Sequence, residues 1–183
     1  MADFLLPFPS RELAAHELSK DPCYERIPVN ERSRLVTLAW EKGSAAAHAL
    51  YDKEEGSYDF TVIARSHGLE VIRKDIDYIV GTNRYFSEYI SGQGRILLYM
   101  KSIALWAEEN NLAHEDAVNV ILSHEFFHFL EWTSLGLTSK NFLVPMLTIG
   151  PLKIGRTGIR ALSEIGAHAF SRTYYERVVE EKE

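Results

Sequence analysis

The chain has 183 residues, of which 46% are hydrophobic and 25% are charged, and its formal net charge is −6. This length allows a single domain with a sizeable core over residues 1–183, and the composition is that of an ordinary globular protein. The acidic balance argues against direct nucleic-acid binding, because recognition of phosphates needs a basic face.

The single cysteine, Cys23, excludes an internal disulfide and a thiolate metal cluster, and it is typical of a reducing, cytoplasmic setting. The amino-terminal segment MADFLLPFPSRE has no basic residue ahead of its apolar run, so we predict no signal peptide. No apolar run reaches the length of a membrane span. We therefore expect a cytoplasmic protein without a membrane partner, and the sequence leaves its oligomeric state open.

The N-terminal part of the chain, residues 1–55, is predicted to be helical. Ser10 is a candidate cap for a short helix over residues 10–20, and Asn30 is one for a longer helix over residues 31–50. Gly43 weakens the expectation that the longer helix is continuous, because glycine disfavours helix interiors.

The remainder, residues 56–183, combines a small sheet with further helices. A helix closed by Gly68 and a short strand over residues 69–72 precede a β-hairpin, in which residues 84–90 and 95–100 flank the turn SGQG. Further helices are predicted over residues 102–110, 111–135 and 158–180. The pattern is α+β, with helices around a small, hairpin-based antiparallel or mixed sheet.

An apolar segment, residues 139–157, separates the last two helices. Pro145, Gly150 and Pro151 interrupt it, and it carries Lys153. We expect this segment to form a lid over a site or a packed loop rather than a membrane segment.

The helix over residues 111–135 contains an HExxH motif within an apolar run. His124 and His128 are four residues apart and therefore lie one turn apart on one helix face, where two imidazoles can hold one Zn²⁺. Glu125 lies about 100° around the helix, so it reaches a water on the metal rather than the metal itself. The motif predicts two metal ligands and a general base, Glu125.

An open zinc site of this kind needs a third protein ligand. A third histidine directly after the motif is excluded, because Ser134 stands at the required position. The candidate is Glu164, 36 residues after His128 on the last predicted helix, where Gly166 and Ala167 would allow close helix packing. The alternative for Glu164 is an ion pair with Arg160, one turn earlier.

The order of these features resembles the ImmA/IrrE-type zinc metallopeptidases. A helix, the strand GLEVI, a hairpin ending in RILLY, HExxH, and EIGAHAF (an E-x-x-A-x-x-F motif at residues 164–170) follow one another over about residues 59–175. The resemblance implies a zincin-like core with the HExxH helix packed against the C-terminal helix, and it implies that Glu164 is the third zinc ligand.

Some features depart from the family pattern. His168 stands where the family commonly has Asn. Phe127 stands where the family often has Gly, and we expect this larger side chain to crowd the site. The connection from the last hairpin strand to the HExxH helix, residues 101–119, is less direct than the one in the family. Within these 183 residues we also expect no DNA-binding helix-turn-helix domain of the kind that some members carry.

Four further residues are weaker candidates, each with a structural alternative. His168 is either a fourth ligand, a hydrogen-bond donor to Glu164, a transition-state stabiliser or a satisfied buried histidine. Tyr174 and Tyr175 either bring a phenol near an oxyanion or are packing residues. Glu131 either holds a ligand histidine in one tautomer or is solvated.

These features predict a zinc-dependent metallopeptidase in which Glu125 assists the attack of a metal-bound water on a peptide bond, in regulatory proteolysis of a protein partner. The strand over residues 95–100 is expected to offer its edge to an extended peptide or protein substrate. One alternative is a catalytically silent zinc-binding regulatory protein of the same fold. Another is a closed structural zinc site with His168 as fourth ligand.

Overall fold

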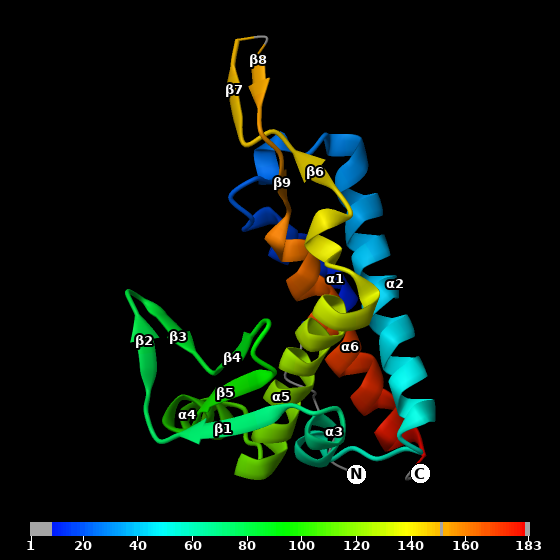
Figure 1. Ribbon diagram of the computed structural model, residues 1–183, viewed down its shortest axis with the longest axis vertical. Coiled ribbons are helices and arrows are strands. Elements are labelled where there is room, and N and C mark those ends of the chain that lie inside the picture. The colour runs from blue at the N-terminus through cyan, green and yellow to red at the C-terminus, as the bar shows by residue number, and fades with distance from the viewer. Residues whose placement is uncertain (1–8, 151, 182–183) are drawn as a thin grey trace.

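The computed structural model of the protein describes residues 9–150 and 152–181 and has the predicted α+β architecture (Figure 1). The α-helices are α1 (Arg11–Ser19), α2 (Val29–Lys53), α3 (Phe60–Ser66), α4 (Met100–Glu109), α5 (His114–Leu130) and α6 (Arg160–Glu180). The strands are β1 (Glu70–Lys74), β2 (Tyr78–Val80), β3 (Asn83–Tyr85), β4 (Ser87–Ile90), β5 (Arg95–Tyr99), β6 (Leu143–Val144), β7 (Leu147–Ile149), β8 (Leu152–Ile154) and β9 (Thr157–Gly158). No helix in these residues combines the length and the apolar character needed to cross a bilayer.

A mixed three-stranded sheet forms beside α5 and has the order β1-β5-β4. The predicted hairpin is confirmed, since β4 pairs antiparallel with β5, and β1 runs parallel to β5 on its other side. The expectation that residues 95–100 offer a free edge is wrong, because β5 is the central strand. Its residues Ile96 and Leu98 are fully buried, so hydrophobic burial places this strand inside the sheet. The edge next to α5 is β4.

Helices α2 and α6 lie side by side along most of their length (Figure 1). The contact is closest at Gly43, where a Cβ atom would lie 2.0 Å from the carbonyl oxygen of Gly166. Gly43 therefore does not interrupt α2, and it allows the backbones of the two helices to touch. The predicted cap at Asn30 is wrong: Pro28 precedes the helix and Asn30 lies in its first turn, consistent with the fixed φ of proline at a helix start.

Helix α5 crosses α6 on the other side of the same glycine. The ring of Phe127 is fully buried, and its Cε1 would lie 2.8 Å from a Cβ atom at Gly166. The expectation that Phe127 crowds the site is wrong, because the ring occupies the space that Gly166 leaves open in the core. Phe127 thus faces away from the cleft described below.

The segment over residues 139–157 is neither a lid nor a packed loop. It forms a short β6–β9 pair, from which the β7–β8 hairpin projects away from the rest of the protein (Figure 1). A second hairpin that the sequence patterns did not reveal, β2–β3, projects beside the central sheet.

Substituting Gly43 with Ala tests the close contact of α2 and α6. In an ordinary helix this change is stabilising, but here the new methyl group meets backbone, so we expect a loss of about 2–3 kcal/mol in the free energy of unfolding. The control is His48→Ala on the exposed side of the same helix, which should change stability by less than about 0.5 kcal/mol. Equal stability of the two variants in urea unfolding would contradict this packing.

Candidate metal centre

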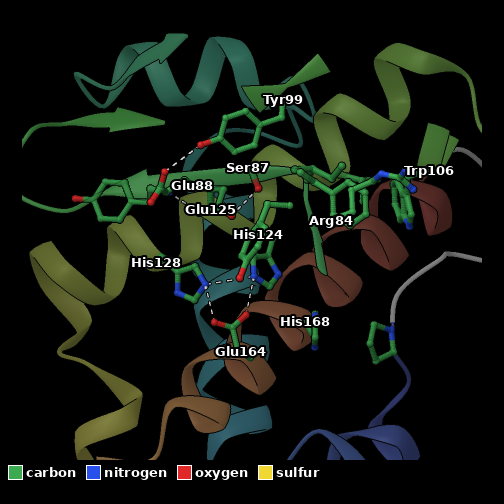
Figure 2. Close-up of a pocket in the computed structure, with 16 residues that line it drawn as sticks. Arg84, Ser87, Glu88, Tyr99, Trp106, His124, Glu125, His128, Glu164 and His168 are labelled. Carbon is green, nitrogen blue, oxygen red and sulfur yellow. Dashed lines mark hydrogen bonds and ion pairs between the residues drawn. The ribbon is translucent and has the colours of Figure 1, made fainter. Parts of the chain in front are cut away.

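The imidazoles of His124 and His128 and the carboxylate of Glu164 point toward one another in the cleft between α5 and α6 (Figure 2). His124 Nε2 lies 3.2 Å from His128 Nε2 and 3.2 Å from Glu164 Oε2. His128 Nε2 lies 3.7 Å from Glu164 Oε1. Helical spacing on α5 places the two rings one turn apart, and the crossing of α6 brings the carboxylate to both.

These separations fit a metal ion held by three protein ligands. Tetrahedral Zn²⁺ with bonds of about 2.0–2.1 Å places its ligand atoms about 3.3 Å apart, close to the distances between these three side chains. In the described part of the chain, His124, His128 and Glu164 form the group of metal-ligating side chains whose ligand atoms all lie within 4.8 Å of one another. Because two ring nitrogens and a carboxylate are all lone-pair donors, a cation at their centre offsets their mutual repulsion.

Glu131 fixes the orientation of one ligand ring. Its carboxylate lies 3.1 Å from His128 Nδ1, and it also accepts hydrogen bonds from Thr138 N at 2.7 Å and from Ser163 Oγ at 3.0 Å. With the proton on Nδ1, the Nε2 lone pair of His128 is free to bind a metal. Glu131 is only 2% exposed, so the alternative of a solvated Glu131 is wrong.

The pKa of His128 reflects the carboxylates around it. Burial lowers this pKa, but the hydrogen bond to Glu131 and the negative charge of Glu164 outweigh burial and raise it to about 9. Burial raises the pKa of Glu164, and the hydrogen bond and charge of His124 reverse that effect and lower it to about 2. In the absence of metal, His128 therefore keeps its second proton at neutral pH, and this positive charge takes the place of a metal cation among the three side chains.

The carboxylate of Glu125 is hydrogen-bonded to strand β4 and is not among the converging ligand atoms. Ser87 Oγ donates to its Oε1 at 2.6 Å, and the backbone N–H of Tyr89 donates to its Oε2 at 2.8 Å. Glu125 is 7% exposed and lines the same cavity as the three ligands. The structure thus separates it from the ligands, as the motif predicts. Ser87 and Tyr89 were not predicted, because no local pattern links a hairpin strand to a helix 36 residues away.

His168 lies next to the trio but not within it. Its ring centroid is 5.1 Å from that of His124, and its nitrogens are not among the converging ligand atoms (Figure 2). No hydrogen bond joins it to Glu164 in the described residues, which argues against both the fourth-ligand and the donor alternatives. Burial and the nearby charge of His124 lower its pKa to about 3, so at neutral pH His168 is an uncharged side chain in the wall of the cleft.

Tyr174 and Tyr175 lie in the core, and their alternative as packing residues is the one that the structure supports. The Tyr174 hydroxyl donates to the carbonyl of Ser57, and the Tyr175 hydroxyl lies 2.6 Å from Asn119 Nδ2. Neither residue lines the cleft. The phenols that do line it come from the strands, Tyr85 on β3, Tyr89 on β4 and Tyr99 on β5.

Two hollows adjoin the ligand trio and share the lining residues Tyr89, His128 and Glu164. The larger, about 630 Å³, is lined on its apolar side by Phe86, Tyr99, Trp106, Val120 and Ile121. The smaller, about 390 Å³, is lined by Trp132, Leu137 and Arg160 among others. No ion pair joins Arg160 to Glu164 among the described residues, so the alternative role of Glu164 is not realised. All three ligands line the larger hollow, which is an open cleft.

No protein-family model, curated protein or solved structure matches this chain. The resemblance to ImmA/IrrE-type metallopeptidases therefore stays a prediction that depends on the motifs.

The raised pKa of His128 gives a pH dependence that can be measured. An unfolded histidine titrates near 6.5, so the proton on folded His128 stabilises the metal-free protein fully below that pH. This contribution is lost as the pH rises through about 9, and we expect the melting temperature in chelator to fall over this interval. Added Zn²⁺ competes with the same proton, so the increase in melting temperature on adding Zn²⁺ should grow across it.

Calorimetry of wild type and His128→Gln, with chelator and with Zn²⁺, tests this dependence. In the variant, the fall of the melting temperature in chelator and the growth of the Zn²⁺-induced increase with pH should both be mostly absent. A melting temperature of the metal-free wild type that stays constant or rises between pH 6.5 and 9 would contradict the assignment.

Replacing Glu131 with Gln tests its role in holding His128. The amide supports the imidazole orientation more weakly, and we expect Zn²⁺ affinity to fall about 10–100-fold in competition with a chromogenic chelator. Glu115→Gln is the matched control, since Glu115 lies on the exposed first turn of α5 and pairs with Arg73. An unchanged affinity in Glu131→Gln would show that the hydrogen bond to His128 is dispensable.

Proposed function

We propose that this protein is a zinc-dependent metallopeptidase with a zincin-like core, of the ImmA/IrrE type that its motifs resemble. The observation that carries the proposal is the convergence of His124, His128 and Glu164 at tetrahedral spacing, with Glu125 beside them in an open cleft. Three protein ligands leave a corner of the tetrahedron for a reacting oxygen, as catalytic zinc sites require.

When bound, the zinc ion supplies Lewis acidity, which acidifies a coordinated water and polarises a peptide carbonyl. Glu125 is the general base: one carboxylate oxygen takes a proton from the attacking water and returns it to the leaving amide nitrogen. Ser87 and Tyr89 hold this carboxylate in place from β4.

The substrate class that the cleft favours is an extended peptide or a protein segment. Tyr99 N donates to Phe86 O, so the backbone groups of Phe86 face β5 and, by alternation along the strand, those of Ser87 and Tyr89 face the cleft. A peptide can add to this edge through main-chain hydrogen bonds. If the peptide takes over the N–H of Tyr89, one oxygen of Glu125 loses its donor and is free to accept a proton.

A second candidate is a zinc-binding regulatory protein without turnover. The observation that favours it is that both oxygens of Glu125 already accept hydrogen bonds, from Ser87 and from Tyr89. In that case the cleft binds a partner segment and the carboxylate stays engaged.

Glu125→Gln distinguishes the two candidates. We expect wild type with Zn²⁺ to cleave members of a peptide library, chelator to abolish cleavage, and the variant to lose at least about 10²-fold in rate while retaining one Zn²⁺ per chain. Glu164→Gln is the companion variant and should lose zinc as well as cleavage. Zinc binding without any metal-dependent cleavage by wild type would favour the regulatory protein. Loss of zinc in Glu125→Gln would overturn the separation of base and ligands.

A further inference from the structure

The β7–β8 hairpin is an amphipathic ribbon with an exposed apolar face. Its register pairs Leu147 with Ile154 and Ile149 with Leu152, so alternation along the strands places these four side chains on one face. They are 51%, 45%, 59% and 57% exposed, respectively. Lys153 alternates with its neighbours on β8 and points to the opposite face.

The chain segment that carries this ribbon differs in charge from the rest of the sequence. The 32 residues from 132 to 163 contain four basic residues and no aspartate or glutamate, whereas the whole chain has a net charge of −6. The four basic residues are Lys140, Lys153, Arg156 and Arg160. An exposed aliphatic face within a purely cationic segment is complementary to a surface that is both apolar and anionic.

The base of the hairpin is held in place. Arg26 donates to the carbonyl oxygens of Pro145 and Met146 at 3.1 and 2.8 Å, and Ile159 N donates to Ser139 O at 2.8 Å. The β6–β9 pair closes the base, and the hairpin points away from the sheet and the cleft (Figure 1). These contacts oppose a movement of the hairpin toward the metal centre, so the apolar face does not serve as a lid over the site.

A second copy of the chain is a poor occupant of this face. Four aliphatic side chains on a two-stranded ribbon provide far less than the roughly 800 Å² per partner of a stable protein interface. Pairing two copies would also bring two cationic segments together, which is unfavourable. A bilayer avoids both limits, because a projecting tip reaches a planar surface and lipid covers its apolar face from several sides.

We propose that the β7–β8 hairpin attaches the protein peripherally to membranes that contain anionic lipids. Leu147, Ile149, Leu152 and Ile154 enter the boundary between headgroups and acyl chains, and Lys153 on β8 and Arg156 just after it contact the lipid phosphates and carboxylates. The attachment needs no spanning segment, and it revises the expectation that the protein has no membrane partner. It does not depend on the proposed peptidase activity.

Sedimentation of the full chain with vesicles tests this attachment. We expect binding to phosphatidylcholine vesicles that contain roughly a third phosphatidylserine, weak binding to phosphatidylcholine alone, and loss of binding as salt is raised. The double variant Ile149→Ser, Leu152→Ser should bind the mixed vesicles at least about tenfold more weakly. Lys153→Glu, Arg156→Glu should lose at least about tenfold as well.

The matched control is Ile79→Ser, Val80→Ser on the other projecting hairpin, where both side chains are 51% exposed. It should bind mixed vesicles like wild type, and circular dichroism should show that all variants are folded. Absence of binding to mixed vesicles, or equal losses in the β2–β3 and β7–β8 variants, would overturn the proposal. Concentration-dependent dimerisation lost in Ile149→Ser, Leu152→Ser, without vesicle binding, would instead assign the face to a second copy.

Discussion

The contact of three helices at Gly166 is the constraint on which the candidate site depends. On one side the carbonyl of Gly166 occupies the space of a missing side chain at Gly43, and on the other the ring of Phe127 occupies the space of a missing side chain at Gly166 itself. Helix α6 is therefore held close to both α2 and α5. Glu164 lies only two residues before this contact, and its carboxylate reaches His124 and His128 because the helix axes are this near.

The charges around the ligand trio favour a cation at its centre. Three carboxylates, those of the buried Glu125 and Glu131 and of the partly exposed Glu164, surround the two imidazoles. Neutral donors satisfy both oxygens of Glu125, from Ser87 and Tyr89, and Oε1 of Glu131, from Thr138 and Ser163, while Oε2 of Glu131 pairs with His128. Glu164, whose side chain is 45% exposed, is paired with the two histidines, and a shared proton or a divalent ion would balance its charge there. The same carboxylates raise the pKa of His128 to about 9. Protonation of His128 and binding of a metal ion each neutralise part of their negative charge, and one excludes the other.

Local sequence patterns were sufficient for most helices, for the β4–β5 hairpin and for the relative placement of His124, Glu125 and His128. These features follow from periodicities of 3.6 and 2 residues, which act within one element. The sequence left open whether Glu131 holds a ligand histidine or is solvated. Its burial depends on Thr138 and Ser163, which fold back over it and which no local pattern predicts. The positions of Tyr174 and Tyr175 show the same limit: a phenol beside a motif is as readily packed in the core. The two projecting hairpins and the edge position of β4 depend on tertiary context, which the sequence patterns did not contain.

The link between β4 and Glu125 connects the fold to both candidate functions. Strand β4 is an edge strand, so its cleft-facing backbone groups need partners other than a neighbouring strand. Tyr89 N–H finds one in the carboxylate of Glu125. In the proposed peptidase, a peptide that pairs with β4 would compete for that N–H and so change the hydrogen bonding of Glu125. Recognition of an extended segment and availability of the proposed base would then be coupled through one donor. This coupling ties turnover to occupancy of the edge in a peptidase, whereas a silent binding protein would use the same edge and keep Glu125 engaged.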